Sequence, residues 1–265
     1  EVKADCGIAF DGDGDRVGVV DNQGNMIPID KFMIIIWRDI YNKVAKKEGF
    51  FDVKCSKALK DELIKLGVKP VETRTGNSYT KKISVENDYP FGGEMSGHLY
   101  FRDKFIGNDD GIYAGLRLVE ILSKTNKKCT ELLDNIPVYY STDENKVPVE
   151  DAIKDKIVSR VEEYAKEKGY NYLTIDGVKV LYDDGFALVR KSNTTPNITT
   201  RYEAKTKERL EEITNEYNSL LDKLKEEIAS SYIFTNATGM GMKPLEGQTY
   251  IPDKSFLRKD SMNFS

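Results

Sequence analysis

The chain has 265 residues, of which 39% are hydrophobic and 10% aromatic, and its formal net charge is −4 at pH 7. This length allows one large domain or two to three smaller domains with packed cores. The nearly balanced charge gives no reason to expect nucleic acid or a membrane surface as a partner, and no apolar run approaches the roughly 18 residues of a membrane-spanning helix. Three unevenly spaced cysteines, Cys6, Cys55 and Cys129, and no signal-peptide pattern indicate free thiols and a cytoplasmic location.

The first half of the chain alternates strands and helices. Asp30 and Ser56 each precede a helical pattern as an expected N-cap, and a glycine follows each pattern. This βαβ order favours an α/β domain built on a parallel or mixed sheet. The expected strands are residues 6–10, 17–20, 50–55, 68–74 and a segment near Phe91, and the expected helices are residues 31–47, 57–66 and 108–124.

The helix expected at residues 108–124 is amphipathic. Asn108 or Asp109 is its expected N-cap. Apolar residues recur at helical spacing at Ile112, Leu116, Val119 and Leu122.

The composition turns polar and proline-bearing around residues 137–148, which indicates a domain boundary. Beyond it the sequence predicts a helix at 150–168, two or three strands within 173–204 and a long charged helix at 205–230. Strands segregated between two helices favour a small α+β domain. Residues 231–265 show little periodicity and are expected to form an extended or disordered tail.

The stretch AFDGDGDRVGVV places Asp11, Asp13 and Asp15 at alternate positions between two apolar strands. Glycines let the backbone curl so that the carboxylates meet, and oxygen ligands select a hard cation such as Mg²⁺. A calcium EF-hand is excluded, because that loop needs glycine and an acid where this sequence has Arg16 and Asn22. Arg16 adds a cation suited to a phosphate or sugar oxygen. The alternative is a solvated turn with fortuitous acids.

Two further loops carry polar chemistry. In GGEMSGH, Glu94, Ser96 and His98 alternate, so an extended loop would aim all three one way, with Glu and Ser suited to sugar hydroxyls. His98 is the only histidine, and a structural hydrogen-bonding role is favoured over catalysis. In RKSNTTPNITTR, Arg190 and Arg201 stand among hydroxyl and amide donors, a composition suited to a phosphate dianion but also to a polar turn.

Two weaker signals lie at expected strand ends, where ligands gather in α/β sheets. One is Lys54 in DVKC, and the other is the glycine-bearing polar loop TRTGNSYTKK at residues 73–82. Neither is specific alone.

Taken in order, these loops resemble those of the α-D-phosphohexomutase family over residues 4–230. DGDGDR resembles its metal loop, GEMSGH its sugar-recognition loop and RKSNTTP its phosphate loop, while DVKC and TGNSYTKK fall where the family has related stretches. The Met95 form of the sugar loop and the Asn-Thr-Thr-Pro phosphate loop are similar to the bacterial phosphomannomutase/phosphoglucomutase branch. The alternatives left open are a phosphoglucosamine mutase and a non-catalytic module that binds sugar phosphates.

The resemblance implies the domain organisation. Residues 1–25 would be the end of the family's second domain, an α/β domain; residues 26–137 the third domain, with its βαβ-type mixed sheet; and residues 138–230 the fourth, α+β domain. The serine that the family phosphorylates, in a TASHNP-like loop, has no counterpart in this chain. The sequence is therefore interpreted as the C-terminal portion of a longer mutase, inactive or nearly so by itself, whose first 25 residues are loosely held without their neighbours.

The resemblance also implies the reaction and the roles of residues. The family interconverts hexose 1-phosphates and 6-phosphates of mannose or glucose through a hexose 1,6-bisphosphate, with Mg²⁺ at the aspartate loop. Arg16 and Lys54 would be basic catalytic residues of the cleft. Substrate-binding residues would be Glu94, Ser96 and His98 for the sugar, and Arg190, Ser192, Asn193, Thr194 and Arg201 for the phosphate. Two residues depart from the family pattern: Asn77 stands where histidine is common, and Lys191 where a small residue is common.

Overall fold

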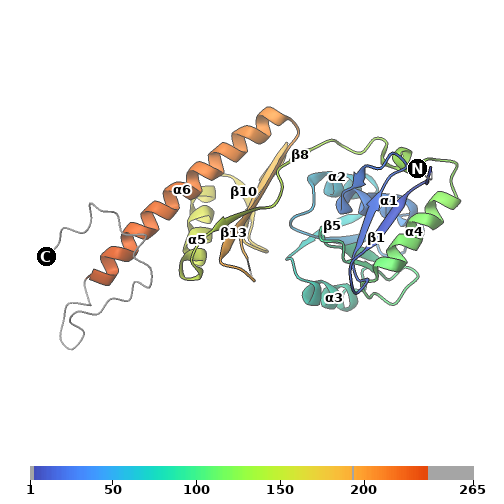
Figure 1. Ribbon diagram of the computed structural model, residues 1–265, viewed down its shortest axis with the longest axis horizontal. Helices are drawn as coiled ribbons and strands as arrows, with labels where there is room; N and C mark the ends of the chain where they lie inside the picture. Colours follow the sequence, from blue (N-terminus) through green and yellow to red (C-terminus); the bar gives the residue numbers. More distant parts are fainter. Residues whose placement is uncertain (1–2, 193, 238–265) are drawn as a thin grey trace.

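The computed structural model describes residues 3–192 and 194–237 of the chain, which form two bodies joined by one extended segment (Figure 1). The first body holds a small sheet and a mixed sheet with their helices, and the second holds an antiparallel sheet covered by two helices. The expected α/β domain followed by an α+β domain is confirmed.

The first body begins with an antiparallel sheet of β1 (Gly7–Phe10), β2 (Val17–Val20) and β3 (Met26–Ile27), in that order. Val17 and Val19 of the central strand are buried against the helices of this body. That residues 1–25 are loosely held stays a prediction. Within the described residues the outer edge of β1 has no strand partner.

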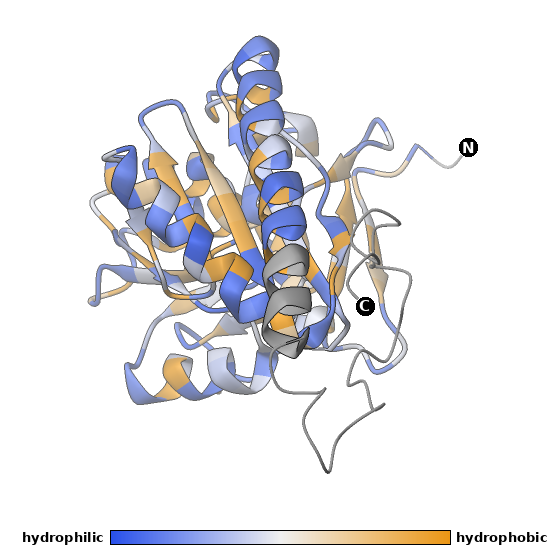
Figure 2. Cartoon of the chain, turned by 90° about the vertical axis from the view of Figure 1, so that its left-hand side faces the viewer, coloured by the Kyte–Doolittle hydropathy of each residue, from blue (hydrophilic) through white to orange (hydrophobic). Residues whose placement is uncertain are grey.

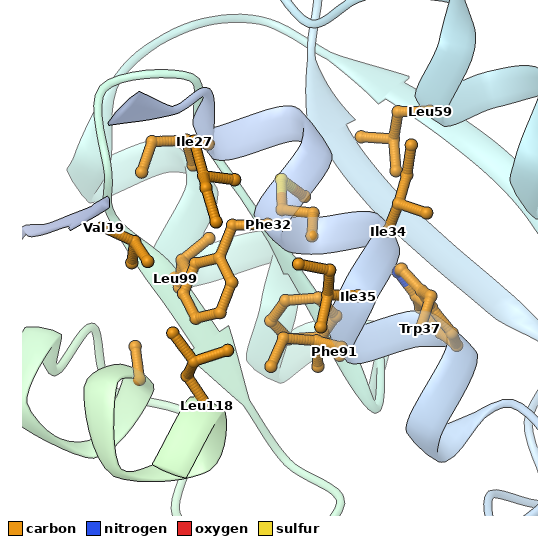
Figure 3. Packing of buried hydrophobic residues seen from close by; sticks show 14 of the residues in the cluster. Val19, Ile27, Phe32, Ile34, Ile35, Trp37, Leu59, Phe91, Leu99 and Leu118 are labelled. Carbon is orange, nitrogen blue, oxygen red and sulfur yellow. The ribbon is translucent and has the colours of Figure 1, made fainter. Parts of the chain in front are cut away.

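The mixed sheet has the order β5-β4-β6-β7, with parallel pairing of β4 to β5 and β6 and antiparallel pairing of β6 to β7. Helix α1 (Ile29–Ile40) is buried against it, and Figure 3 shows Phe32, Ile35 and Trp37 of α1 beside Phe91 of the sheet. The bounds are β4 (Glu48–Asp52), α2 (Lys57–Lys65), β5 (Lys69–Thr73), α3 (Asn77–Glu86), β6 (Phe91–Gly93), β7 (Leu99–Phe101), α4 (Gly111–Ser123) and the 3-10 helix η1 (Cys129–Leu133).

Ser56 caps α2 as expected, with its hydroxyl accepting from the Ala58 amide, but Asp30 does not cap α1. The buried Asp30 carboxylate accepts instead from the amide of Ser56 at 2.9 Å, so it fastens α1 to the start of α2. Helix α1 ends at Ile40 rather than at residue 47, because residues 41–47 reverse the chain before β4 begins.

Two further expectations change. The polar stretch expected as a loop contains helix α3, which begins at Asn77 after Gly76, whose φ of 137° lies in the left-handed region. The sequence pattern did not indicate helix α3, because its buried residues are Thr80 and Ser84 rather than apolar residues. The N-cap of α4 is Asp110, whose carboxylate accepts from the Tyr113 amide.

Of the four apolar residues that indicated an amphipathic helix, Leu122 packs against the core and the other three lie on the outer face of α4. Ile112, Leu116 and Val119 are 54%, 61% and 46% exposed. The buried side carries a second apolar set at the same spacing, namely Ala114, Leu118 and Ile121.

The second body is an antiparallel sheet of order β10-β11-β12-β13-β8, with β9 also paired to β13. Helices α5 and α6 cover one face and bury Ile157, Val161 and Tyr217 against Tyr202 (Figure 1). In Figure 2 the outward side of both helices is hydrophilic and the strands behind them are hydrophobic. The bounds are β8 (Tyr140–Ser141), β9 (Asn145–Pro148), α5 (Asp151–Glu167), β10 (Asn171–Leu173), β11 (Val178–Tyr182), β12 (Gly185–Lys191), β13 (Asn197–Ala204) and α6 (Lys207–Ala237).

The expected tail is corrected at its start. Helix α6 continues past residue 230 to Ala237, because this stretch contains no glycine or proline to end it. The rest of the expected tail, residues 238–265, lies outside the described residues. None of the helices in the described ranges combines the length and the apolar character that crossing a bilayer requires.

The other face of the second sheet meets the first body. Phe186 and Leu188 of β12 pack against Val53, which follows β4. Beside this contact the buried Lys179 ammonium lies 2.7 Å from the Glu72 carboxylate at the end of β5. The two bodies therefore share a small apolar contact and a buried ion pair.

Candidate functional site

The aspartate loop gathers its three carboxylates. Oxygen atoms of Asp11, Asp13 and Asp15 lie within 4.8 Å of one another. Burial and the nearby Asp13 and Asp11 charges raise the pKa of Asp15, although His98 acts in the opposite direction. Arg16 donates from Nε to Asp11 Oδ2 at 2.6 Å. Burial would raise the pKa of Asp11, but the hydrogen bonds and the charge of Arg16 together outweigh it and hold the pKa below its ordinary value. The loop thus crowds negative charge that one arginine only partly offsets, and its all-oxygen donor set fits a hard divalent cation.

Two glycines fix this loop against helix α4. The amide of Gly111 donates to the carbonyl of Gly14 at 2.9 Å. A Cβ atom at residue 111 would lie 2.5 Å from the Arg16 carbonyl oxygen, so only glycine allows this approach. Gly14 itself has a φ of 74°. The start of α4 therefore sets the position of the carboxylates.

The sugar loop expected at residues 93–98 lies directly beside the aspartate loop. Arg16 and His98 form an isolated antiparallel bridge, and the Val17 amide donates to the carbonyl of Gly97 at 3.3 Å. Gly97 has a φ of 104°, and a Cβ there would lie 2.9 Å from the Val17 carbonyl oxygen. The tertiary structure brings the two motifs together across 80 residues of chain.

His98 belongs to a polar cluster with Asp15, Asp109 and Asn77. Its Nδ1 atom lies 3.0 Å from Asp109 Oδ2 and 3.6 Å from Asp15 Oδ2. Asn77 Nδ2 donates to the same Asp109 oxygen at 2.7 Å. The sequence reasoning considered Asp109 only as a helix cap and missed this role, and the pair of adjacent aspartates before α4 was the available signal. Asp15, His98 and Asp109 also form a second group whose potential ligand atoms lie within 4.8 Å of one another.

Glu94 is only 2% exposed and holds neighbouring segments together. Its Oε1 accepts from the Gly76 amide at 3.1 Å and from the Thr80 hydroxyl at 2.5 Å, and its Oε2 accepts from the Ser96 hydroxyl at 3.2 Å. Ser96 is exposed. The carboxylate therefore links the sugar loop to the start of α3, while the hydroxyl reaches solvent.

Lys54 stands at the junction of the two bodies. Its ammonium lies 3.4 Å from the carboxylate of Glu144, which precedes β9, and 3.9 Å from that of Asp52. Burial raises the pKa of Asp52, with Lys54 acting against that rise. Lys54 thus links the end of β4 to the turn between β8 and β9 of the second body.

The expected phosphate loop follows β12. Arg190 is buried, with 6% exposure, and donates from Nε to Asp176 Oδ2 at 3.0 Å. The Ser192 hydroxyl accepts from the Thr194 amide at 3.4 Å and shares a 2.8 Å hydrogen bond with the Thr195 hydroxyl. Arg201 is half-buried on β13, in register with Leu188, which places it on the sheet face toward the first body. The expected phosphate ligand Asn193 lies outside the described residues.

Lys191 is turned away from this loop. Its ammonium donates to Asp155 of α5 at 2.6 Å, and both side chains are exposed. A different lysine, Lys154 of α5, is 6% exposed and donates to the carbonyls of Ser192 and Thr195. Sequence reasoning missed Lys154, because one lysine in a charged helix carries no signal.

A continuous set of hydrogen bonds joins the phosphate loop to the sugar loop. Asp176 accepts from Arg190 and, at 3.0 Å, from the amide of Thr75. The next residue, Gly76, donates to Glu94. The structure therefore brings the aspartate, sugar and phosphate loops into one connected region that spans both bodies.

A cavity of about 210 Å³ also lies at the junction, lined by residues that include Phe51, Lys57, Lys60, Lys179 and Phe186. None of the residues that the sequence assigned to a site lines it. We place the candidate site at the connected loops, because they hold the convergent polar groups.

Comparisons with known proteins agree with this arrangement. Residues 28–140 match the model of phosphoglucomutase/phosphomannomutase alpha/beta/alpha domain III, and residues 144–219 match that of the phosphoglucomutase/phosphomannomutase C-terminal domain. The fold is that of the later domains of a sugar-phosphate mutase. The chain belongs to the phosphomannomutase/phosphoglucomutase family and contains its domain III and its C-terminal domain.

Among its relatives, the phosphomannomutase/phosphoglucomutase of Pseudomonas syringae is 40% identical over 224 residues, which cover 84% of this chain and 48% of the relative. A crystal structure of a family protein from Burkholderia thailandensis superposes with a TM-score of 0.77 at 36% identity, covering 84% of this chain and 47% of that one. The chain spans about half the length of the relatives it matches. N-acetylphosphoglucosamine mutase from Aspergillus fumigatus, in complex with GlcNAc-6P and magnesium, shares the fold with a TM-score of 0.59 at 15% identity, covering 81% of this chain and 51% of that one.

Proposed function

We propose that this chain supplies the sugar-binding and phosphate-binding half of a phosphomannomutase/phosphoglucomutase. The complete enzyme interconverts hexose 1-phosphate and hexose 6-phosphate of mannose or glucose through a hexose 1,6-bisphosphate. The observation that carries this proposal is the connected set of contacts from Arg190 through Asp176, Thr75 and Gly76 to Glu94. This set of contacts joins the groups suited to a phosphate with those suited to sugar hydroxyls. A hexose phosphate carries both kinds of group and would need both binding regions close together.

Mg²⁺ is the proposed metal, held by Asp11, Asp13 and Asp15. Burial and, after it, the nearby aspartates raise the pKa of Asp15, and a bound cation would offset this cost of charging the carboxylate. When bound, the ion stabilises negative charge on the transferring phosphoryl group. Arg16, half exposed beside these carboxylates, adds a positive charge next to the same region.

The remaining residues hold the substrate. Arg190, Ser192 and Thr194 grip the phosphate that is not being transferred, with Asn193 and Arg201 as further proposed ligands. Ser96 presents its hydroxyl to the sugar, Glu94 orients that hydroxyl, and His98 lies next to them. Lys54 adds charge from the junction. A fixed phosphate grip beside a sugar grip lets the bisphosphate bind in two opposite orientations, which the interconversion needs.

The isolated chain is expected to bind substrate without turning it over, because the phosphoryl carrier of the family reaction has no counterpart among its residues. The test is a mutase assay of the 265-residue chain with glucose 1-phosphate, Mg²⁺ and glucose 1,6-bisphosphate, beside a full-length relative. Turnover at the rate of the relative would contradict the prediction that the isolated chain is inactive. Titrations with mannose, glucose and glucosamine phosphates would assign the sugar, and a preference for glucosamine phosphate would favour a phosphoglucosamine mutase instead.

The metal assignment has its own test. Calorimetry is expected to show Mg²⁺ binding by the wild-type chain and at least about a tenfold loss of affinity for Asp15→Asn, because a carboxylate ligand is removed. The control is Asp5→Asn, which removes an exposed acid outside the loop. Equal affinities for the two variants would contradict the assignment.

A further inference from the structure

Asp176 lies in the turn between β10 and β11 and packs against the phosphate grip. Its neighbour Gly177 has a φ of 78°, and a Cβ atom there would lie 2.4 Å from the Val189 carbonyl oxygen and 2.6 Å from Arg190 Cα. The turn thus lies so close to the backbone of Arg190 that only glycine fits at residue 177. The Asp176 side chain itself is 13% exposed.

One oxygen of Asp176 serves both bodies. Oδ2 accepts from Arg190 Nε at 3.0 Å within the second body and from the Thr75 amide at 3.0 Å in the first. Among the described residues, Nε is the only atom of the Arg190 guanidinium with a hydrogen bond to the protein. Toward the described residues, the terminal nitrogens, which form the fork that binds a phosphate bidentately, donate no hydrogen bond.

The segment that Asp176 contacts is also part of the sugar site. Gly76, next to Thr75, donates to Glu94, and Asn77 donates to Asp109 beside His98. A displacement of this segment would therefore reach both the sugar loop and the histidine cluster.

The geometry points to Asp176 as a positioning residue that orients Arg190 for phosphate and fastens the second body to the sugar loop. This inference rests on the proposed function, because it assigns Arg190 to phosphate binding. Asp176 does not touch the substrate. Its single carboxylate makes the alignment of the phosphate grip depend on the approach of the first body, so phosphate and sugar recognition are coupled.

The first test needs no ligand. The protons of the Thr75 amide and of Arg190 Nε both donate to Asp176, so their hydrogen exchange in the full 265-residue chain, measured by NMR, reports the two contacts separately. Asp176→Asn keeps the shape but removes the charge, and Asp176→Ala removes the acceptor. We expect exchange of both protons to accelerate about tenfold or more in Asp176→Ala and less in Asp176→Asn.

The matched control is Asp183→Asn, an exposed acid in the next turn of the same sheet. It makes the same change of charge without touching either donor, and wild-type exchange is expected. Unchanged exchange of both protons in the Asp176 variants would overturn the inference. Faster exchange of only one would overturn the shared role of the carboxylate. Asp176→Asn keeps the test valid if Asp176→Ala unfolds.

The second test uses inorganic phosphate and glucose 6-phosphate as calorimetric probes. Asp176→Asn is expected to weaken phosphate binding about tenfold, because Arg190 loses a charged partner, and to weaken glucose 6-phosphate binding further. If Asp176→Asn lowers the affinity for both probes equally, phosphate and sugar recognition are not coupled through Asp176. If it lowers neither affinity, Asp176 does not position Arg190. If the wild-type chain binds neither probe while exchange responds as expected, the proposed function fails and the contact between the bodies stands.

Discussion

The ammonium group of Lys154 on α5 donates to the main-chain carbonyl of Ser192 at 3.1 Å and so holds the phosphate loop against this helix. The same ammonium donates to the carbonyl of Thr195 and pairs with Asp151 in the first turn of α5. Two carbonyls of the loop are therefore held by one buried charge, and the loop is positioned by a helix that precedes it by about forty residues.

Replacing Lys154 by Met tests this support. The two carbonyls lose a charged donor, so Lys154→Met is expected to lower the free energy of unfolding by about 2 kcal/mol and to weaken phosphate binding. Urea unfolding and calorimetry measure the two effects. The control is Lys156→Met, which removes an exposed lysine from the same helix and should be nearly neutral. Equal stabilities of the two variants would contradict the role of Lys154.

The ion pairs of Glu72 predict how stability depends on pH. Burial raises the pKa of the Glu72 carboxyl, but attraction to Lys179 and Lys60 outweighs it and holds the pKa below its ordinary value. A carboxyl with a lowered pKa in the folded state contributes stability above its unfolded pKa, and this contribution is lost as pH falls through the folded value. Glu72→Gln should therefore cost roughly 2 kcal/mol at pH 7 and progressively less as pH falls below about 4.3.

Urea unfolding at a series of pH values checks this difference. The control is Glu86→Gln, because Glu86 is 58% exposed and its ion pair with Lys82 lies at the surface. It should change stability little at any pH. A cost of Glu72→Gln that stays constant down to pH 3 would show that the charge of Glu72 is not the cause.

Gly111 predicts how the aspartate loop responds to helix α4. A methyl group at this position would meet the carbonyl oxygens of Arg16 at 2.5 Å and Gly14 at 2.9 Å, so the loop must move. Gly111→Ala should lower the free energy of unfolding by about 2 kcal/mol and weaken Mg²⁺ binding. Gly12→Ala is the control within the same loop, because its Cβ would meet nothing within 4 Å. Equal Mg²⁺ affinities in both variants would contradict the proposed contact.

The two apolar sets of α4 predict opposite responses. Leu116 is 61% exposed, so Leu116→Lys should change the free energy of unfolding by less than about 0.5 kcal/mol. Leu118 is fully buried, so Leu118→Ala should cost about 3 kcal/mol. Thermal and urea unfolding of both variants measure these two changes in the free energy of unfolding. A large loss for Leu116→Lys would mean that its face is covered in solution.

Local sequence determined the features that depend on neighbouring residues. Alternate aspartates with glycines specify a loop that gathers carboxylates, because backbone freedom and charge lie within a few residues of each other. Ser56 capped its helix as expected, because a cap acts on amides two residues away. The alternation of strands and helices in the first body, apart from α3, and with it the fold class, followed from the same short-range patterns.

Tertiary structure decided whatever depends on distant partners. Two apolar sets of α4 fit a helical period, namely Ile112, Leu116 and Val119, and Ala114, Leu118 and Ile121. Only the packing of α4 in the folded structure decided that the set with Leu118 is the buried one. Asp176 meets Thr75 across 101 residues, and Lys154 meets Ser192 across 38. Periodicity and spacing act over a few turns of chain, whereas these polar contacts form only when separate elements approach, so they belong to the folded structure alone.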